Sequence, residues 1–260
     1  KREPLAMSEN GKSIDPRVIL VTGGSRGIGA ATATLLALKG HAIVVSYLMA
    51  DSEALDLVNK ITEVGGRIIA VKGDIACEVD VANLYKIAED KFGPVQAVVH
   101  CASPSPIPQP FDSLDWQTFQ KHIDTQIQGA FNCAKYALPK MTASGAGAFV
   151  FLSSVFADGL PPSQQTAYVT VKAGLAAMAR SLAVEYGPKG IRVNIVSPGM
   201  TQTEMISRIP DKVKMLTKMN TPLRRLADAE DVAATIDFLL SSAAKHITGE
   251  NIRVCGGISM

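Results

Sequence analysis

The sequence predicts an α/β protein with one parallel sheet that is covered by helices on both faces. Two observations support this class. Short apolar segments alternate with longer segments of helical period along most of the chain, and the apolar segments are nearly continuous in Val, Ile, Leu and Ala. Strands that are apolar on both sides are buried on both sides, which is typical of a parallel sheet between two helical layers.

Seven segments have the length and composition of buried strands. They are RVILVT at 17–22, AIVVSY at 42–47, RIIAVK at 67–72, QAVVHC at 96–101, AFVFLSS at 148–154, IRVNIVS at 191–197 and NIRVC at 251–255. Helical patterns lie between them, near 27–39, 51–64, 78–92, 113–141, 164–186 and 228–241, and a polar stretch occupies 203–220. This alternation also fits an eight-stranded β/α barrel, so the choice of architecture depends on the first turn.

Composition and domain organisation narrow the class of protein. We expect one domain over 17–260, whereas residues 1–16 are polar and aperiodic and are expected to be a disordered leader or an expression remnant. The net charge of +2 gives no global field for nucleic acid, and no apolar run is long enough to span a membrane. The four cysteines lack the spacing of a metal site or disulfide framework, so a cytoplasmic, metal-free protein is expected.

A glycine-rich turn, TGGSRGIG at 22–29, directly follows the first strand. Free N–H groups at the start of the next helix can bind a pyrophosphate, and glycine lets the backbone approach it. Alone, the motif would also fit a structural βα turn. Its TGxxxGxG spacing resembles that of the short-chain dehydrogenase/reductase family, which implies a doubly wound, Rossmann-type sheet. The resemblance assigns cofactor contacts to Gly23, Ser25, Arg26, Gly27, Ile28 and Gly29.

The end of the second predicted strand indicates which nicotinamide cofactor is preferred. Enzymes that select NAD place an acid there, which binds the ribose hydroxyls and would repel a 2′-phosphate. This chain has Ser46 and Tyr47 instead, and Arg26 can pair with a phosphate. We therefore expect NADP(H) to be preferred over NAD(H). The first acid that follows, Asp51, is expected to cap the next helix.

Three further segments resemble cofactor contacts of the family. Asp74 and Ile75 match the acid and the apolar neighbour placed beside the adenine, although Asp74 could equally be a turn or N-cap residue. The sequence HCAS at 100–103 replaces the usual NNAG, and Cys101 and Ala102 are expected to keep the backbone contacts. The segment SPGMTQT resembles the turn that receives the nicotinamide end, which implies contacts by Pro198, Gly199, Thr201 and Thr203.

The catalytic candidates are Ser154, Tyr168 and Lys172. Tyr168 and Lys172 lie four residues apart on one predicted helix, so their side chains share a face. A phenol titrates near pH ~10, and the neighbouring ammonium is expected to lower the pKa of Tyr168. The resemblance implies that Ser154 holds the substrate oxygen, Tyr168 passes the proton, and Lys172 also binds the nicotinamide ribose.

Two polar residues near this set depart from the family pattern. The family's fourth catalytic residue, an asparagine, falls at Gln126, which has the same amide on one more methylene. The water relay to Lys172 could therefore persist with a shifted geometry. His100 could act as a base, but a buried histidine with satisfied hydrogen bonds is the more common case.

The close Tyr–Lys spacing and Ser154 favour carbonyl reduction over enoyl reduction. The segments PLRRLADAEDVAATIDFLLSS and ITGENIRVCGGISM resemble bacterial 3-oxoacyl-carrier-protein reductases. This implies NADPH-dependent reduction of a ketone, a 3-oxoacyl thioester or a related β-dicarbonyl, with the substrate chosen by segments 104–112, 156–165 and 200–225. The alternatives are an NAD-dependent secondary alcohol or sugar dehydrogenase and a nucleotide-binding regulator without turnover.

Small residues suggest how the chain assembles. The helices near 113–141 and 164–186 are rich in alanine, and close helix contacts between subunits are expected, as in relatives that form tetramers. The alanines concerned are Ala130, Ala134, Ala137, Ala173, Ala176, Ala177 and Ala179. A homotetramer is therefore expected.

A local concentration of charge indicates a candidate partner. Between Met205 and Arg225 the chain has six basic residues against one acidic residue, a net charge of +5. Lys189 resembles in position a basic residue with which relatives dock acidic acyl carriers. An acyl carrier protein is therefore a candidate partner, and a solvated lid is the alternative.

Overall fold

The computed structural model describes residues 17–259, so the expected leader at 1–16 lies outside the described residues. Seven parallel strands form one sheet in the order β3-β2-β1-β4-β5-β6-β9. Their bounds are β1 Val18–Thr22, β2 Ala42–Tyr47, β3 Arg67–Lys72, β4 Ala97–His100, β5 Gly147–Leu152, β6 Ile191–Pro198 and β9 Asn251–Val254. The structure confirms the doubly wound, Rossmann-type sheet.

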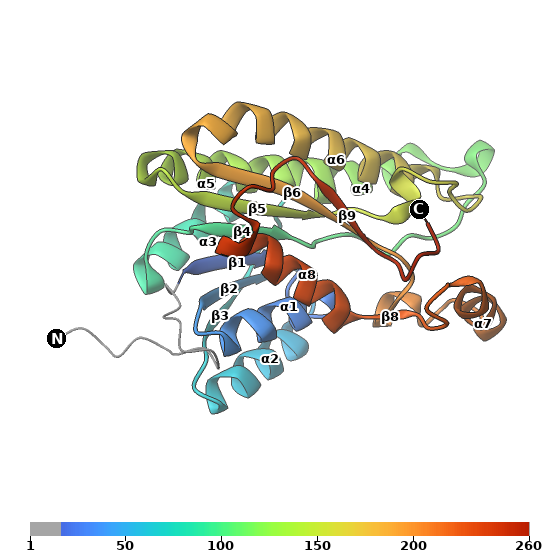
Figure 1. Ribbon diagram of the computed structural model, residues 1–260, viewed down its shortest axis with the longest axis horizontal. Coiled ribbons are helices and arrows are strands. Elements are labelled where there is room, and N and C mark those ends of the chain that lie inside the picture. The colour runs from blue at the N-terminus through green and yellow to red at the C-terminus, as the bar shows by residue number, and fades with distance from the viewer. Residues whose placement is uncertain (1–16, 260) are drawn as a thin grey trace.

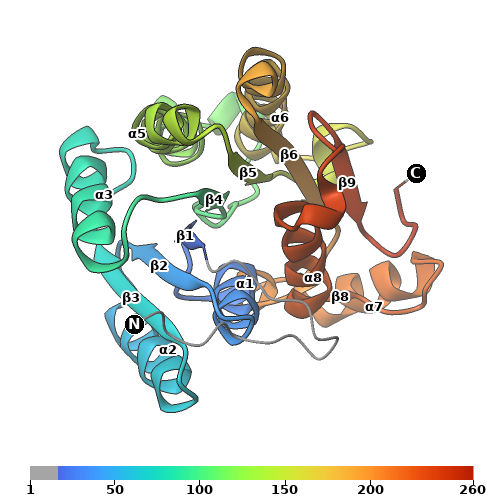
Figure 2. The same ribbon diagram turned by 60° about the vertical axis from the view of Figure 1, so that its left-hand side comes forward.

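Helices cover both faces of this sheet (Figures 1 and 2). One face carries α1 (Gly27–Leu38), α2 (Asp51–Glu63) and α8 (Ala229–Leu240), and the other carries α3 (Glu78–Phe92), α5 (Gly129–Ser144) and α6 (Thr166–Tyr186). Successive strand residues alternate between the two cores: Leu20 packs with the α3, α5 and α6 layer, whereas Ile19 and Val21 pack with the other layer. This explains the continuous apolar runs of the sequence.

The long helix predicted near 113–141 is interrupted. Helix α4 spans Trp116–Ile123, a π-helical turn follows over Asp124–Gln128, and α5 then begins at Gly129. The residues of the turn, DTQIQ, include no proline or glycine that would mark an interruption, so the sequence did not predict it. π-helical turns occur frequently at functional sites, and this one contains Gln126.

The polar stretch near 203–220 forms part of a segment that projects from the body of the molecule (Figure 1). It contains β7 (Thr201–Gln202), α7 (Asp211–Asn220) and β8 (Ala227–Asp228), and the two short strands pair in parallel. The sequence did not predict these elements, because strands of two residues carry no detectable pattern. We call residues 200–228 the lid segment.

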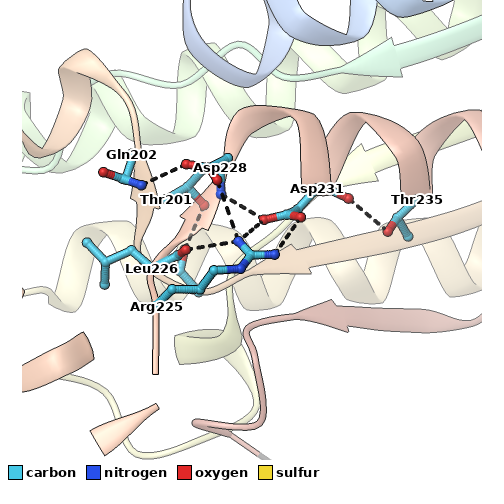
Figure 3. A network of polar contacts seen from close by, with 8 residues as sticks. Thr201, Gln202, Arg225, Leu226, Asp228, Asp231 and Thr235 are labelled. Atoms are coloured by element: carbon cyan, nitrogen blue, oxygen red, sulfur yellow. Dashed lines mark hydrogen bonds and ion pairs between the residues drawn. The ribbon is translucent and has the colours of Figure 1, made fainter. Parts of the chain in front are cut away.

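Polar contacts fix the end of the lid segment to α8 (Figure 3). Gln202 Nε2 donates to Asp228 Oδ1 at 2.7 Å, and Asp228 and Asp231 form a capping box at the start of α8. Arg225 donates both guanidinium branches to Asp231, and this hydrogen bonding lowers the pKa of Asp231 to about 2. The base of the lid segment is therefore held in place while α7 extends away from the sheet.

The strand order reverses at β1, which pairs with β2 on one side and with β4 on the other. In open α/β sheets, ligands bind in the crevice at the carboxyl ends of the strands where the order reverses. The glycine turn after β1 and the HCAS segment after β4 both lie at this position.

Candidate active site

The glycine turn forms an anion site at the start of α1. Arg26 is at the N-cap position without a side-chain cap, and the first turn of the helix contains no acidic residue. A Cβ atom on Gly29 would lie 2.4 Å from the carbonyl oxygen of Gly23, and one on Gly23 would lie 2.7 Å from Cα of Ala102. The turn therefore closes tightly only with glycine, and it leaves uncapped N–H groups where a diphosphate could bind.

The end of β2 also suits a dinucleotide. Ser46 is buried, and its Oγ atom has no hydrogen-bond partner within residues 17–259. A buried hydroxyl without a partner is unfavourable, so a ligand oxygen at this place would stabilise it. Tyr47 next to it is partly exposed. Together with the glycine turn, these residues fit a nicotinamide dinucleotide.

The expectation that Asp51 caps α2 is wrong. Ala50 is at the N-cap position, and Asp51 is the first helical residue. The Asp51 carboxylate accepts two hydrogen bonds of 2.9 Å from Lys72 Nζ, which lower the pKa of Asp51. The acid nearest to Ser46 and Tyr47 in sequence is thus already neutralised by a cation.

An ion pair that the sequence did not reveal links the glycine turn to the lid segment. Arg26 Nη1 lies 3.0 Å from Glu204 Oε2, and both side chains are more than half exposed. Thr203 is also adjacent, since a Cβ atom on Gly27 would lie 3.3 Å from its methyl group. Arg26, which is predicted to bind a phosphate of the cofactor, is therefore paired with a carboxylate that is 178 residues away in sequence.

Asp74 and Ile75 form a turn that α5 holds in place. Asp74 Oδ1 accepts a hydrogen bond of 2.9 Å from the N–H of Ala76, so this oxygen stabilises the turn, which was one of the two roles considered for Asp74. Ile75 is buried, and Asn132 Nδ2 donates to its carbonyl at 3.0 Å. The predicted adenine contact remains a prediction.

The HCAS segment packs directly against the glycine turn through Thr22. The Thr22 hydroxyl lies 3.0 Å from His100 Nδ1 and accepts from the N–H of Ala102 at 3.3 Å, while the N–H of Cys101 donates to the Thr22 carbonyl at 3.2 Å. Sequence reasoning did not single out Thr22. Burial lowers the pKa of His100 to about 3 and raises that of Cys101 to about 12, so the imidazole is neutral and the thiol is protonated near pH 7.

Ser154, Tyr168 and Lys172 come together at the carboxyl end of β5 and the start of α6. Lys172 Nζ donates to the carbonyl of Leu152 at 2.7 Å and lies 5.6 Å from the centre of the Tyr168 ring. Ser153 Oγ donates to the carbonyl of Lys172 at 3.0 Å and so ties the strand end to the helix. Ser154 after β5 and the Tyr168–Lys172 pair on α6 thus form one site, and Ser153 holds the strand end and the helix together.

The pKa directions at this site differ from the sequence expectation. Burial raises the pKa of Tyr168, and the neighbouring Ser154 hydroxyl opposes this. The expectation of a net lowering by Lys172 is wrong, because burial of the phenol has the larger effect on its pKa. Burial also lowers the pKa of Lys172 to about 8. The phenol is therefore protonated near pH 7, which suits a proton donor.

No hydrogen bond joins Gln126 to Lys172 within the described part of the chain. It is completely buried in the π-helical turn, and its Nε2 atom lies 3.2 Å from Nδ1 of His122, one helical turn earlier. Its Oε1 atom has no partner among residues 17–259. The ring of His122 meets that of Tyr168 edge to face, with centroids 6.3 Å apart. Sequence reasoning missed His122, although the i, i+4 spacing to Gln126 was visible.

The turn after β6 closes the site from the other side. Pro198 ends the strand, and the N–H of Gly199 donates to the carbonyl of Val254 at 3.0 Å. A Cβ atom on Gly199 would lie 3.0 Å from that of Cys255, and Thr201 Oγ1 donates to the Gly199 carbonyl at 3.1 Å. Because Thr203 lies beside Gly27, this turn and the glycine turn border the same crevice.

Two surface predictions need correction. Five of the seven predicted interface alanines, Ala130, Ala134, Ala137, Ala176 and Ala179, are buried in the core of the same chain. The lid cations are partly engaged as well: Arg225 pairs with Asp231, Lys214 pairs with Asp211, and the Arg224 side chain donates to the Met219 carbonyl. The local charge of +5 is therefore not presented as one free patch.

Other site classes find little support between residues 17 and 259. That part of the chain brings together no group of three His, Cys, Asp or Glu residues that could hold a metal ion. It also has no helix that combines the length and apolar character required to traverse a bilayer. All four cysteines are free thiols.

The fold and the site define a nucleotide-binding oxidoreductase. A family model described as "Enoyl-(Acyl carrier protein) reductase" matches residues 23–259. Among similar proteins, the cis-4-hydroxycyclohexanecarboxylate dehydrogenase of Sinomonas cyclohexanicum is 36% identical over 247 residues, which is 95% of this chain and 98% of that protein. The 3-oxoacyl-(acyl-carrier-protein) reductase FabG of Staphylococcus aureus (strain Mu50) is 34% identical over 93% of this chain and 97% of its own length.

A solved structure, that of a short-chain type dehydrogenase/reductase from Mycobacterium ulcerans, superimposes with a TM-score of 0.89 at 30% sequence identity. The match covers 95% of this chain and 91% of that one. The chain belongs to the short-chain dehydrogenase/reductase family, and it is an NAD(P)-dependent oxidoreductase that acts on CH–OH or C=O groups.

Proposed function

We propose that the protein reduces a ketone to a secondary alcohol with NADPH, and that the substrate is a 3-oxoacyl thioester or a related β-dicarbonyl. The observation that carries the proposal is the union of Ser154, Tyr168 and Lys172 beside the glycine turn. The FabG relative supports the substrate class, because its name states 3-oxoacyl reduction. The close Tyr–Lys spacing and Ser154 favour C=O over C=C reduction, despite the enoyl reductase description of the family model.

Each group has a role that follows from its place. Bound NADPH supplies a hydride. The Ser154 hydroxyl, at the end of β5, donates a hydrogen bond to the ketone oxygen and orients the carbonyl. Tyr168, protonated near pH 7, gives that oxygen its proton as negative charge develops on it. Lys172 binds the nicotinamide ribose, and its ammonium group stabilises the phenolate that remains.

The cofactor preference rests on charge at the end of β2. Ser46 and Tyr47 carry no carboxylate there, and Lys72 neutralises Asp51. Arg26 can exchange its exposed partner Glu204 for a 2′-phosphate, since a surface ion pair contributes only about 0–1 kcal/mol. NADPH is therefore proposed over NADH.

The experiment is a matrix of two cofactors and two substrate types. Oxidation of NADPH or NADH is followed with acetoacetyl-coenzyme A and with 4-oxocyclohexanecarboxylate, the ketone that corresponds to the substrate named for the Sinomonas relative. We expect the highest kcat/KM with NADPH and acetoacetyl-coenzyme A. Higher kcat/KM with NADH and the ring ketone would instead support the alternative of an NAD-dependent alcohol dehydrogenase. Tight cofactor binding without turnover of any ketone would support a regulator.

Carrier docking is proposed on the part of the lid segment whose cations remain free. Arg208, Lys212 and Lys218 have no ion pair within the described residues. Reversal of Lys212 and Lys218 to Glu should raise KM for a carrier-bound 3-oxoacyl substrate, and added salt should shrink this effect. Lys60→Glu on α2 is the matched control. Equal effects on a small neutral ketone would refute docking.

Assembly and compartment are proposed on separate grounds. Phe131 on α5 and Val184 on α6 are large apolar side chains that are 55% and 80% exposed, and burial between subunits would remove them from water. A homotetramer through these helices is proposed on this basis, in place of the buried alanines. The free thiols support a reducing compartment such as the cytoplasm.

A further inference from the structure

A small cavity lies beside the catalytic tyrosine. It is lined by Tyr168, by His122 and Thr118 of α4, and by Gln109 and Gln164 from the two loops predicted to select the substrate. Its volume of about 10 Å³ has room for about one water molecule. The two loops are joined by a hydrogen bond of 2.9 Å from the N–H of Gln109 to the carbonyl of Gln164. The two loops therefore meet beside Tyr168.

The backbone of this cavity is strained at one position. Gln164 has a φ of +64°, and besides Arg224 it is the only non-glycine residue with positive φ in the described chain. Such strain is typical of functional sites. The cavity lining contains amide, hydroxyl and imidazole groups but no carboxylate. This chemistry suits an uncharged or anionic oxygen atom better than a cation.

The orientation of the Gln126 amide sets which ring nitrogen of His122 carries the proton. The NH2 group of the Gln126 side chain can only donate, and it lies 3.2 Å from Nδ1 of His122, so in this orientation of the amide Nδ1 is the acceptor. The neutral ring therefore carries its hydrogen on Nε2. That atom has no hydrogen-bond partner among residues 17–259, and the ring lines the cavity.

The ring stays neutral near pH 7. Burial and the charges of Lys172 and Lys121 lower the pKa of His122 from 6.5. The other group facing the ring is Tyr168, which is protonated there and contacts the imidazole edge to face. His122 thus offers a neutral Nε2–H donor and carries no charge. Its ring lies next to the ring of Tyr168, with centroids 6.3 Å apart.

We propose that His122 is a specificity-determining residue, whose Nε2–H binds a second oxygen of the substrate while Tyr168 acts on the reacting ketone. Gln126 is the positioning residue that holds the His122 tautomer. The ring centroids of His122 and Tyr168 are 6.3 Å apart, so two hydrogen bonds of about 2.8 Å can reach two oxygens of one small molecule. The preferred substrates are therefore ketones with a second carbonyl oxygen close to the first. The inference rests on the proposed ketone reduction.

The test compares two ketones of similar size. Ethyl acetoacetate has the second oxygen, and 2-hexanone lacks it. The measured quantity is the selectivity ratio, kcat/KM for ethyl acetoacetate divided by kcat/KM for 2-hexanone. His122→Phe, which keeps a planar ring but removes the donor, should lower this ratio about tenfold, as expected for the loss of one hydrogen bond, mainly through a higher KM for ethyl acetoacetate.

Three further variants separate recognition from structural damage. His122→Gln restores an N–H donor and should recover part of the ratio. Gln126→Leu removes the hydrogen bond to Nδ1 of His122, so the ring can carry its hydrogen on either nitrogen, and the ratio should fall by about threefold. Gln117→Leu, at an exposed position of the same helix, is the control and should keep the ratio of the unmodified protein.

The outcomes distinguish this inference from the proposed function. If the unmodified protein reduces both ketones and His122→Phe leaves the ratio unchanged, the inference is wrong while the ketone reductase proposal stands. The same conclusion follows if the selectivity ratio of His122→Gln is as low as that of His122→Phe. If the unmodified protein reduces neither ketone nor acetoacetyl-coenzyme A, the proposed function is wrong, and the inference is refuted with it.

Discussion

Lys172 should make the stability of the protein depend on pH in a specific window. The residue is only 3% exposed, and burial lowers its pKa from 10.5 to about 8. Below pH ~8 the lysine is charged in both the folded and the unfolded chain. Between pH ~8 and ~10.5 the unfolded chain binds more protons than the folded one. The contribution of Lys172 to stability therefore rises with pH across this window.

The magnitude follows from the shift. One pKa unit corresponds to about 1.4 kcal/mol, so the shift of Lys172 to about 8 corresponds to roughly 3 kcal/mol in the free energy of unfolding. Lys172→Met removes this titration. It also leaves the Leu152 carbonyl without its donor, but that cost does not depend on pH. The pH-dependent part of the difference between the two proteins thus reports the lysine alone.

The assay is reversible urea unfolding of the cofactor-free protein and of Lys172→Met, at one protein concentration and at several pH values from 7 to 10.5. Relative to the variant, the unmodified protein should gain roughly 3 kcal/mol over this range. Cys101, whose pKa is raised by burial to about 12, lowers the stability of both proteins as the pH rises above its ordinary pKa, so its contribution largely cancels in the difference. A difference in stability that stays flat with pH would refute the buried, charged lysine on which the site electrostatics depend.

Three other predictions address the cofactor site and assembly. Glu204→Gln should tighten NADPH binding about two- to fivefold in a fluorescence titration by freeing Arg26; equal tightening of NADH would mean that Arg26 does not contact the 2′-phosphate. Gly29→Ala should lower the free energy of unfolding by about 1–3 kcal/mol and weaken cofactor binding, because the new methyl group meets the Gly23 carbonyl. Gly187→Ala is the control: its methyl group meets no atom within 4 Å, so stability and cofactor binding should both stay unchanged. Light scattering at micromolar concentration should show a tetramer, and a monomer would exclude it.

The sequence predicted the main sheet well because its signal is local. All seven strands occur within a residue or two of their predicted limits, since a strand buried on both faces needs an apolar run. The π-helical turn around Gln126 was not predictable, because its residues, DTQIQ, include no proline or glycine that would mark an interruption of the helix. The β7–β8 pair was missed because each strand has only two residues.

The candidate site was predictable in its residues but less so in its contacts. Ser154, Tyr168 and Lys172 were found because spacing places them at one strand end and on one helix face. The ion pair of Arg26 and Glu204 depends on the tertiary fold, so no local pattern announces it. The predicted direction of the Tyr168 pKa shift was wrong because residue spacing cannot show how far the fold buries the phenol.

The most direct test of the central claim is the rate of NADPH-dependent reduction of acetoacetyl-coenzyme A by Tyr168→Phe, measured together with its Kd for NADPH. The substitution removes one hydroxyl and retains the ring that packs against His122. We predict that kcat falls by about 10²- to 10⁴-fold, as is typical for loss of a general acid, while Kd stays within about threefold. A variant that retains near-normal kcat would show that another group donates the proton and would contradict the assignment of Tyr168.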